Sequence, residues 1–245
     1  MTSRSNKRLP TKEPVDFPDA ALEETIREAI FRPDGKMYKF DVERLTELTP
    51  SQKSIRDPTG LEYATSLKNL AFAPSRIRDV SPLVGLVNLK YLILMSDQMR
   101  DLSPLAKLTK LTGLSLSANK IRDIWPLIKL TNLDLVDLSS NKIKDISPLT
   151  NLAKLTALDL GHNQISDISP LADLIHLENL GLSGNQISDI SPLVHNEGLG
   201  AGDRVGLRWN PLNSDSINIH IPELRARGVD VEYYEGEHPF QYTGP

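Results

Sequence analysis

Acidic side chains near a histidine are the residues of this chain whose spacing could support chemistry. Asp137 and Asp159 stand 22 residues apart, and His162 follows the second of them closely. Two carboxylates and an imidazole can bind a metal ion or transfer protons. However, one histidine with two carboxylates is a weak ligand set, and no second histidine falls on the same expected face. We therefore predict no metal site and no acid–base centre here, and we interpret His162 as a surface histidine.

The same spacing governs a longer series of aspartates, each followed by a turn such as Ile146-Ser147-Pro148-Leu149. The series consists of Asp57, Asp79, Asp101, Asp123, Asp145, Asp167 and Asp189. In such a turn the serine can cap a short helical segment, and proline suits the first helical position. We interpret the aspartates as further acceptors for the free N–H groups of the turns, because catalysis gives no reason to repeat one acid in every unit.

The composition argues against the other catalytic chemistries. The chain contains no cysteine, which excludes disulfides, thiolate metal sites and cysteine nucleophiles. It also lacks a glycine-rich loop for phosphates and a nucleophile with a matched base. We predict that the protein is not an enzyme and that it uses no cofactor.

Bulk properties narrow the expected partners. Of the 245 residues, 39% are hydrophobic and 24% are charged, and the formal net charge is −4. No stretch approaches about 18 consecutive apolar residues, so we expect no membrane insertion. Aromatic residues make up only 5%, which leaves few stacking platforms for single-stranded nucleic acid. We expect a monomer whose partner is another protein rather than a nucleic acid.

The elements that must position these side chains follow the same period. A leucine opens each unit at positions 45, 67, 89, 111, 133, 155 and 177. Most units contain the pattern L-x-x-L-x-L-x-x-N, as in Leu111, Leu114, Leu116 and Asn119. A fixed period of about 20–29 residues with this consensus is typical of leucine-rich repeats, in which each repeat contributes one short strand to a solenoid. We predict an α/β repeat solenoid, a curved array with a parallel concave sheet and short 3-10 turns on its convex side.

Both ends of a solenoid need caps, because they expose the apolar core. We predict a polar leader over 1–14 and a single domain over 15–245. Within the domain, 15–48 is the helical N-terminal cap, 49–210 holds the repeats and 211–245 is a helix-containing C-terminal cap. The leader has basic residues with no apolar run behind them, so no secretory signal is expected, and the protein would be cytoplasmic if Met1 is the native start.

Apolar spacing places helices in both caps. An apolar stripe predicts one N-terminal helix, formed by Leu22, Ile26, Ala29 and Ile30. A second short helix is expected over 41–48. At the other end we expect a helix around 214–227, ended by Gly228, and a closing strand over 229–233.

Asparagines at the ends of the later strands are predicted to hold neighbouring repeats together. They are Asn119, Asn141, Asn163, Asn185 and Asn210. Their amides can bond backbone groups that the bend of the chain would otherwise leave unpaired. The earlier units carry Lys53, Ser75 and Asp97 at this position, so the first half should lack the asparagines and depend on the N-terminal cap.

The concave face should carry the side chains that flank the buried leucines, because side chains alternate along a strand. Tyr91, Ile93 and Met95 give one strand an apolar surface, with Leu135 two strands away and a notch expected at Gly113 between them. Exposed apolar side chains that cluster in this way mark contact sites.

Charged residues complete the predicted site. The two strands that carry Asp137 and Asp159 should lie about 4.8 Å apart, where like charges repel each other unless a cation relieves them. Arg204, Arg208 and Trp209 end the face, and both residue types are enriched in binding hot spots. The predicted partner-binding residues are Tyr91, Ile93, Met95, Leu135, Asp137, Asp159, His162, Arg204, Arg208 and Trp209. Because small residues separate them, an alternative interpretation remains open, in which the concave face has no selected partner.

The block N-x-I-x-D-I-S-P-L, as in 163–171, resembles the 22-residue repeats of bacterial internalin-like leucine-rich repeat proteins over about 65–210. The flanks depart from the internalins, because no immunoglobulin-like domain follows the repeats. They are more similar to uncharacterised bacterial repeat proteins with a helical cap, here 17–30, and an N-P-L…R-G-V tail, here 210–229. The resemblance implies protein binding on the concave face.

A second class of function would use the edge of the array. Basic residues line its first half, at Arg56, Arg76, Arg78, Arg100, Lys120, Arg122, Lys142 and Lys144. Such a stripe can bind an anionic polymer or an acidic partner. We favour a solvated edge neutralised by the neighbouring aspartates, with a protein of unknown identity bound on the concave face. The alternatives are a binder of anionic polymer and a purely structural or engineered scaffold.

Overall fold

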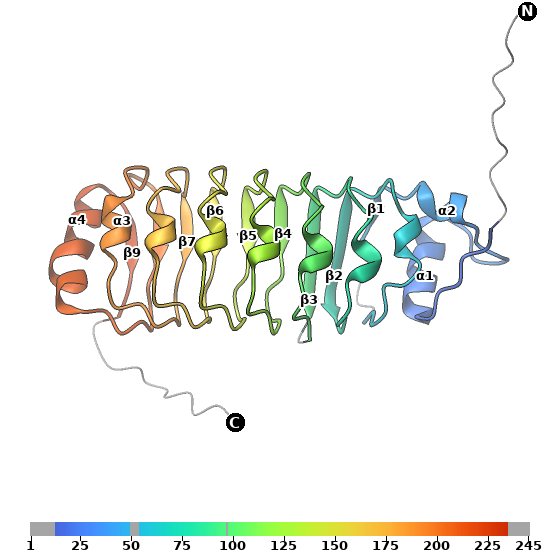
Figure 1. The fold of residues 1–245 in the computed structure, drawn as a ribbon, viewed down its shortest axis with the longest axis horizontal. Helices are drawn as coiled ribbons and strands as arrows, with labels where there is room; N and C mark the ends of the chain where they lie inside the picture. Colours follow the sequence, from blue (N-terminus) through green and yellow to red (C-terminus); the bar gives the residue numbers. More distant parts are fainter. Residues whose placement is uncertain (1–12, 50–53, 97, 235–245) are drawn as a thin grey trace, which may run out of the picture.

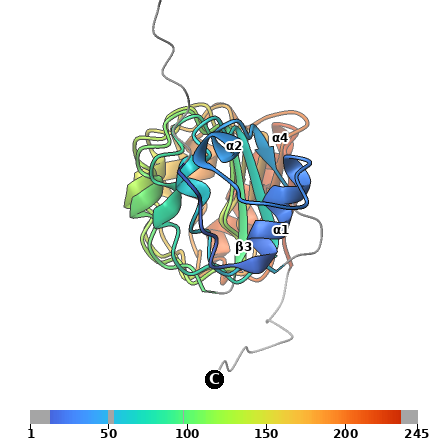
Figure 2. The ribbon, with the colours of Figure 1, turned by 90° about the vertical axis from the view of Figure 1, so that its right-hand side faces the viewer.

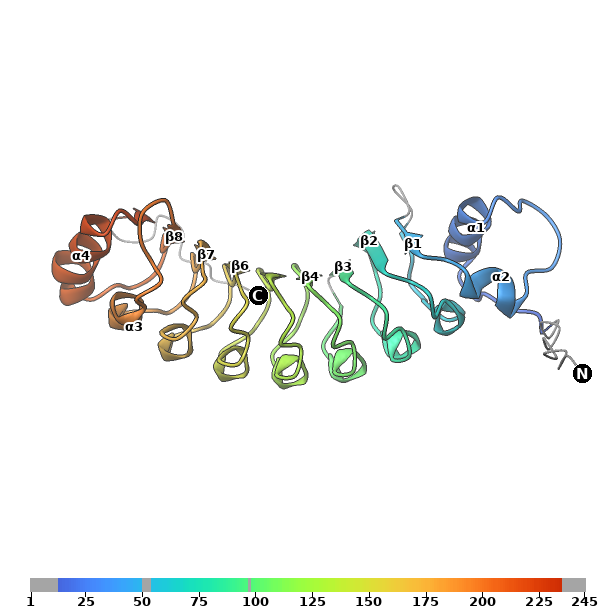
Figure 3. The ribbon, with the colours of Figure 1, turned by 90° about the horizontal axis from the view of Figure 1, so that it is seen from above.

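The computed structural model describes residues 13–49, 54–96 and 98–234 of the chain. In this part of the chain nine parallel strands form one sheet, ordered β1 to β9 as in the sequence. Figure 3 shows an arc with the strands along its inner edge and short helical turns along its outer edge. The predicted solenoid with a parallel concave sheet and 3-10 turns on the convex side is therefore confirmed.

Each repeat contributes one strand and one turn, and the turns cross in front of the strands in Figure 1. The strands are β1 (Glu47–Leu48), β2 (Asn69–Ser75), β3 (Tyr91–Ser96), β4 (Gly113–Ser115), β5 (Leu135–Asp137), β6 (Ala157–Asp159), β7 (Asn179–Gly181), β8 (Arg204–Gly206) and β9 (Asp230–Glu232). The 3-10 turns are η1 (Leu61–Tyr63), η2 (Ser81–Leu83), η3 (Ser103–Leu105), η4 (Trp125–Leu127), η5 (Ser147–Leu149) and η6 (Ser169–Leu171). The last turn is lengthened into the helix α3 (Ser191–His195).

The core is a stack of leucines, because each repeat places the same side chains inward. Leu114 and Leu116 are 3% and 0% exposed, and their counterparts in the other repeats are buried as well. The repeat length keeps the strands in register, so that Leu92 pairs with Leu114 and Leu114 with Val136. Residues that are 22 apart therefore form columns across the sheet, as the period predicted.

The aspartate series caps the turns. All seven aspartates accept the backbone N–H of the residue two positions later, at 2.8–2.9 Å. In the repeat of Asp145, hydrogen bonds from the Ser147 side chain and backbone lower the pKa of the carboxyl. The expected acceptor role is confirmed, but the expected cap is wrong, because Ser147 is the first residue of the turn and Pro148 the second. The bend places the aspartate, rather than the serine, in front of the free N–H groups.

The asparagines join each repeat to the one before it. Asn141 donates from its amide to Leu116 O at 3.0 Å in the preceding repeat and to Leu138 O at 3.0 Å in its own. Its carbonyl accepts from Ile121 N at 3.0 Å, also in the preceding repeat. Asn119, Asn163, Asn185 and Asn210 make equivalent bonds. Each amide thus satisfies backbone groups that the bend leaves unpaired.

The residue before each asparagine has a left-handed backbone. The φ angle is +57° at Ala118, +56° at Ser140, +54° at His162 and +58° at Trp209. A non-glycine residue accepts this conformation at a cost of about 1–2 kcal/mol. We attribute the conformation to the following asparagine, whose amide reaches under the strand only if the chain reverses sharply at this point.

The N-terminal cap holds α1 (Ala20–Ala29) and α2 (Lys39–Glu43), and it closes the end of the array that faces the viewer in Figure 2. Leu22 and Ile26 are fully buried as predicted, but Thr25 is buried and Ala29 is exposed. The expected second helix is present, but its predicted range of 41–48 is wrong. Asp41 lies inside α2 and accepts the N–H of Tyr38 at 3.0 Å, so the helix begins earlier, and Glu47–Leu48 pair with β2 instead.

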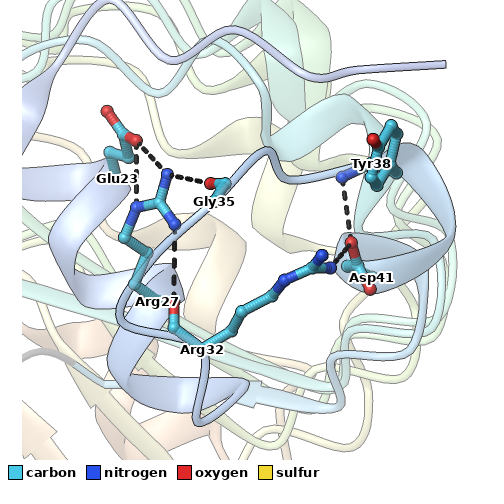
Figure 4. Close-up of polar contacts among 6 residues, drawn as sticks. All are labelled: Glu23, Arg27, Arg32, Gly35, Tyr38 and Asp41. Atoms are coloured by element: carbon cyan, nitrogen blue, oxygen red, sulfur yellow. Dashed lines mark hydrogen bonds and ion pairs between the residues drawn. The ribbon is translucent and has the colours of Figure 1, made fainter.

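Two arginines fasten the loop between these helices, as Figure 4 shows. Arg27 binds Glu23 Oε1 at 2.7 Å and donates to Gly35 O at 2.9 Å. Arg32 binds Asp41 Oδ2 at 2.6 Å. These bonds hold the loop against both helices of the N-terminal cap.

Asp19 joins the cap to the first repeat. Its Oδ1 accepts from Ala21 N and Leu22 N at the start of α1, and its Oδ2 accepts from Arg56 N at 2.7 Å and Asp57 N at 3.1 Å. Burial raises the pKa of this carboxyl, but the four backbone N–H groups outweigh burial, and the pKa is lowered. Neither the cap of α1 by Asp19 nor its bonds to the first repeat were predicted from the sequence.

The C-terminal cap covers the opposite end of the array, at the left of Figure 1. A π-helical segment over Ser216–His220 continues into α4 (Ile221–Ala226), and the chain turns at Gly228, where φ is +91°. The predicted helix is present, and β9 lies within the predicted closing strand. The lengthened repeat before it depends on buried Asn196, whose amide donates to Leu171 O at 2.8 Å. Gly198 follows, and a Cβ there would lie 1.8 Å from Ile175 O, so only glycine fits.

Candidate functional site

The concave face carries the predicted site residues in the predicted columns. One column runs through Tyr91, Gly113, Leu135, Ala157, Asn179 and Arg204. The next runs through Ile93, Ser115, Asp137, Asp159, Gly181 and Gly206. Together they line a groove of about 580 Å³ that extends from β3 to β8. The strands hold every one of these side chains on one rigid surface.

Large apolar side chains gather at the N-terminal end of this groove. Tyr91 is 48% exposed, Ile93 38%, Met95 41% and Leu135 46%. We call these four residues the apolar zone. The core of the array is closed beneath them, because Leu92 and Leu94 are fully buried. Their exposure therefore reflects their position on the strand and not a gap in the packing.

Glycines beside the apolar zone and elsewhere on the face receive side chains of the preceding repeat. A Cβ on Gly113 would lie 2.6 Å from Tyr91 Cδ1, so the tyrosine ring covers this glycine. The notch expected at Gly113 is thus filled by the Tyr91 ring, which the sequence did not predict. Gly181 is covered in the same way by the Asp159 carboxylate, and Gly184 by the His162 ring. Because these glycines have no side chain, the side chains of the predicted site residues can lie directly over them.

The acidic zone, Asp137 and Asp159, lies in the centre of the groove. Asp137 accepts from Ser139 N at 3.0 Å, Ser139 Oγ at 2.7 Å and Ser115 Oγ at 3.0 Å. Asp159 accepts from Gly161 N at 2.8 Å through Oδ1. Burial in the groove raises the pKa of Asp159, and the Asp137 charge raises it further, while the Gly161 N–H and His162 oppose the rise. Over the described ranges no basic side chain lies within 4.0 Å of either carboxylate.

No arrangement of ligands for a metal ion accompanies these carboxylates. The described residues include no group of three or more histidine, aspartate or glutamate side chains that could hold one. The ring of His162 lies 5.7 Å from that of Trp209, centroid to centroid, in a tilted arrangement. The histidine therefore belongs to an aromatic contact at the rim of the face.

The basic zone, Arg204, Arg208 and Trp209, ends the groove. Arg208 lies 5.0 Å from the ring centroid of Tyr234, and its Nε is 3.5 Å from Glu232 Oε2. Tyr234 also contacts Trp209, at 6.2 Å between ring centroids. Sequence reasoning missed Glu232 and Tyr234, although alternation along β9 places Glu232 in the column of Gly206. Arg204 is exposed at the end of the groove and has no carboxylate within 4.0 Å in the described residues.

The neighbouring aspartates were expected to neutralise the cations of the basic edge, but they form no short ion pairs with them in the described residues. The aspartates beside it direct their carboxylates to the N–H groups of the turns. Consequently, in the ranges that the structure covers, none of the eight edge cations forms an ion pair shorter than 4.0 Å. Any neutralisation by these aspartates acts over a longer distance. A hollow at the start of the edge is lined by Arg56, Arg76 and Arg78.

No described helix combines the length and apolar character needed to cross a membrane.

Comparisons with known proteins support the fold and the family. A family model described as leucine-rich repeats (2 copies) matches residues 109–154, 131–173 and 153–195. No curated protein sequence matches the chain significantly. The crystal structure of internalin C2 from Listeria monocytogenes is similar, with 28% identity and a TM-score of 0.76 over 89% of this chain and 94% of that one.

Two more distant structures share the fold alone. A leucine-rich repeat protein of Leptospira interrogans is 23% identical with a TM-score of 0.71, over 78% of this chain and 50% of that one. The leucine-rich repeat ectodomain of the plant receptor kinase GASSHO1/SCHENGEN3 from Arabidopsis thaliana, in complex with CASPARIAN STRIP INTEGRITY FACTOR 2, is 21% identical with a TM-score of 0.53. That likeness covers 69% of this chain and 24% of the ectodomain. The repeat consensus, the solenoid and the likeness to internalin C2 together support the resemblance of this chain to the internalin-like leucine-rich repeat proteins.

Proposed function

We propose that this protein is a non-enzymatic module that binds another protein through its concave face. Leucine-rich repeat proteins are in general protein-interaction modules, and the plant ectodomain above is itself in complex with another molecule. The observation that carries the proposal is the apolar zone, four large apolar side chains exposed together on rigid strands at one end of a groove. Contiguous exposed apolar surface of this kind marks interaction sites.

Affinity capture tests the proposal with no need to name the partner in advance. The intact protein is compared with the variant Tyr91→Ala, Ile93→Ser and Met95→Ala. A matched control removes exposed apolar side chains outside the groove, through Val84→Ser, Val87→Ser and Trp125→Ala. We expect a protein that is captured by the intact chain and the control but not by the first variant. Capture that survives the first variant contradicts the proposal.

Single substitutions then measure the contribution of each side chain. Tyr91→Ala and Leu135→Ala should each weaken binding of that partner by about 1 kcal/mol or more, as is typical of contact residues near an interface centre. Both side chains are about half exposed, so the melting temperature should change little. Calorimetric titration and thermal unfolding measure the two effects. If stability falls as much as affinity, these side chains serve packing rather than binding.

A second candidate function, binding of an anionic polymer, is supported by the edge cations that lack short ion pairs. Heparin at low ionic strength is the probe. If this function operates, retention on heparin falls steeply with added salt. Charge reversal through Arg78→Glu, Arg100→Glu and Arg122→Glu should then abolish retention while leaving concave binding intact. Absence of salt-sensitive retention removes this candidate.

A further inference from the structure

The apolar, acidic and basic residues follow one another in a fixed order along the groove. This order limits the kind of peptide segment that can bind there. Along the array, the apolar zone on β3 and β5 is followed by the acidic zone on β5 and β6, and then by Arg204 on β8. Adjacent strands lie about 4.8 Å apart. The middle of the apolar zone is therefore about 7 Å from the middle of the acidic zone, which is about 12 Å from Arg204.

Among the described residues, the acidic zone has no basic side chain within 4.0 Å to balance its charge. Asp137 has serine and backbone donors, but Oδ2 of Asp159 accepts no hydrogen bond from the described residues. The two carboxylates lie on paired residues of neighbouring strands, where like charges are unfavourable. Burial in the groove raises the pKa of Asp159, and the Asp137 charge adds to this rise. A cationic side chain placed between them would reduce this repulsion and would donate to Oδ2 of Asp159.

We propose, on the basis of the function proposed above, that the groove binds an extended segment of a partner protein bearing an apolar side chain, a nearby lysine or arginine, and a carboxylate farther along. The apolar side chain packs on Tyr91 and Leu135. The ammonium or guanidinium group donates to Asp137 and Asp159, and the carboxylate binds Arg204. Charge complementarity with the three zones supports this occupant over a uniformly apolar or uniformly charged one.

The spacing of the zones converts this into a sequence pattern. In an extended chain, side chains on one face recur about every 6.6 Å, since each residue spans about 3.3 Å. A basic residue therefore lies two positions from the apolar residue. The acidic residue lies about four positions beyond the basic one, because the remaining distance is about 12 Å. The pattern applies in either chain direction, since the order of the zones fixes the order of side chains and not the direction of the backbone.

Selection from a displayed library of random dodecapeptides tests this pattern. The intact protein is one bait, and the variant Asp137→Asn with Asp159→Asn is the second. Because asparagine retains a carbonyl acceptor for the Gly161 N–H, this variant is expected to fold. A matched control, Asp173→Asn with Glu197→Gln, removes the same amount of charge from exposed positions outside the groove.

We expect peptides from the intact protein and the control to carry a basic residue two positions from an apolar one. This preference should be lost on the Asp137→Asn, Asp159→Asn bait. A selected peptide, resynthesised, should bind that variant about tenfold more weakly or worse, as expected for loss of charge-assisted hydrogen bonds. Exchanging its basic and acidic residues should weaken binding to the intact protein similarly.

Three results would overturn the inference. If selected peptides require Tyr91 and Leu135 but show no preference for a basic residue, the proposed order of charges in the bound segment is wrong, while binding at the concave face remains supported. If no selected peptide depends on Tyr91 and Leu135, concave binding fails as well. If the intact protein self-associates in sedimentation and the Asp137→Asn, Asp159→Asn variant does not, the occupant is a second copy of the chain.

Discussion

The early and late repeats of this array stabilise the same fold by different means. From β4 to β8 the strands are three residues long, and each is followed by a left-handed residue and an asparagine that is buried or half-buried. In the early half β2 has seven residues and β3 has six. Of the early positions that lack asparagine, Ser75 is described, while Lys53 and Asp97 lie outside the described residues.

The difference shows two ways of satisfying backbone groups at the same bend. In the late repeats an amide bonds groups of two repeats at once, which allows the strand to end early. In the early repeats the strands continue, and β2 pairs with β3 as far as Ser75 and Ser96, with a shift of register after Phe72. Ser75 Oγ adds one bond to Met95 O at 3.0 Å. Among the described residues, the early half therefore has fewer side-chain bonds between repeats, and it carries most of the apolar zone.

The largest change in the free energy of unfolding is expected when one of the asparagines is replaced. Asn141→Ala removes four hydrogen bonds and leaves buried partners without them, so we expect a loss of about 3 kcal/mol in the free energy of unfolding. Ser75→Ala removes one bond and should cost about 1 kcal/mol. Urea unfolding of both variants gives the comparison. Equal losses would mean that the two halves are stabilised alike.

The next effect concerns the cap that the early half depends on. Asp19→Ala removes the cap of α1 and both bonds to the first repeat, and we expect a loss of about 2 kcal/mol. Because the pKa of Asp19 is lowered in the fold, its contribution is present above the unfolded pKa and is lost as the pH falls through the folded pKa. The variant and the parent should therefore converge in stability in strong acid. A loss that is independent of pH would contradict this account.

Amide exchange measures the comparison residue by residue. Repeat arrays open in parts, because each repeat contacts only its neighbours. We expect exchange to be slowest over about 115–190 and about tenfold faster over 54–100, a difference of about 1.4 kcal/mol. Asp19→Ala should accelerate exchange first in the early segment. Uniform protection from end to end would show that the cap and the early repeats are coupled more tightly than their hydrogen bonds suggest.

The smallest effect separates binding from stability in the acidic zone. The folded pKa of Asp159 is raised, so its ionised form destabilises the fold, and stability falls as the pH rises from the unfolded toward the folded pKa. At pH 7 Asp159→Asn should therefore be neutral or stabilising by about 0.5 kcal/mol at most, since the groove is open and solvent screens the charge of the partly buried carboxylate. At pH 3, where the carboxyl is protonated, the difference should vanish. A loss of stability at pH 7 would indicate that Asp159 has a packing role.

The repeats and most of the site surface followed from the sequence. Inward leucines, asparagine positions and concave columns depend on the period and on alternation along a strand, both of which are local rules. The prediction failed where contacts within a turn or cap, and not the period or strand alternation, determine the local structure. The early start of α2 depends on the bond between Asp41 and Tyr38 N, and the aspartates, rather than the serines, cap the turns.

By itself, the sequence determined the solenoid, the identity of the residues in each column and their order along the array, because a constant period fixes the register of every strand. Tertiary structure alone decided how these side chains lie on their neighbours. The ring of Tyr91 fills the space above Gly113, and the Asp159 carboxylate lies over Gly181. Asp19 reaches the first repeat, and Tyr234 joins Trp209. Such contacts connect residues of different repeats, and side-chain rotamers that depend on distant neighbours leave no periodic signal in the sequence.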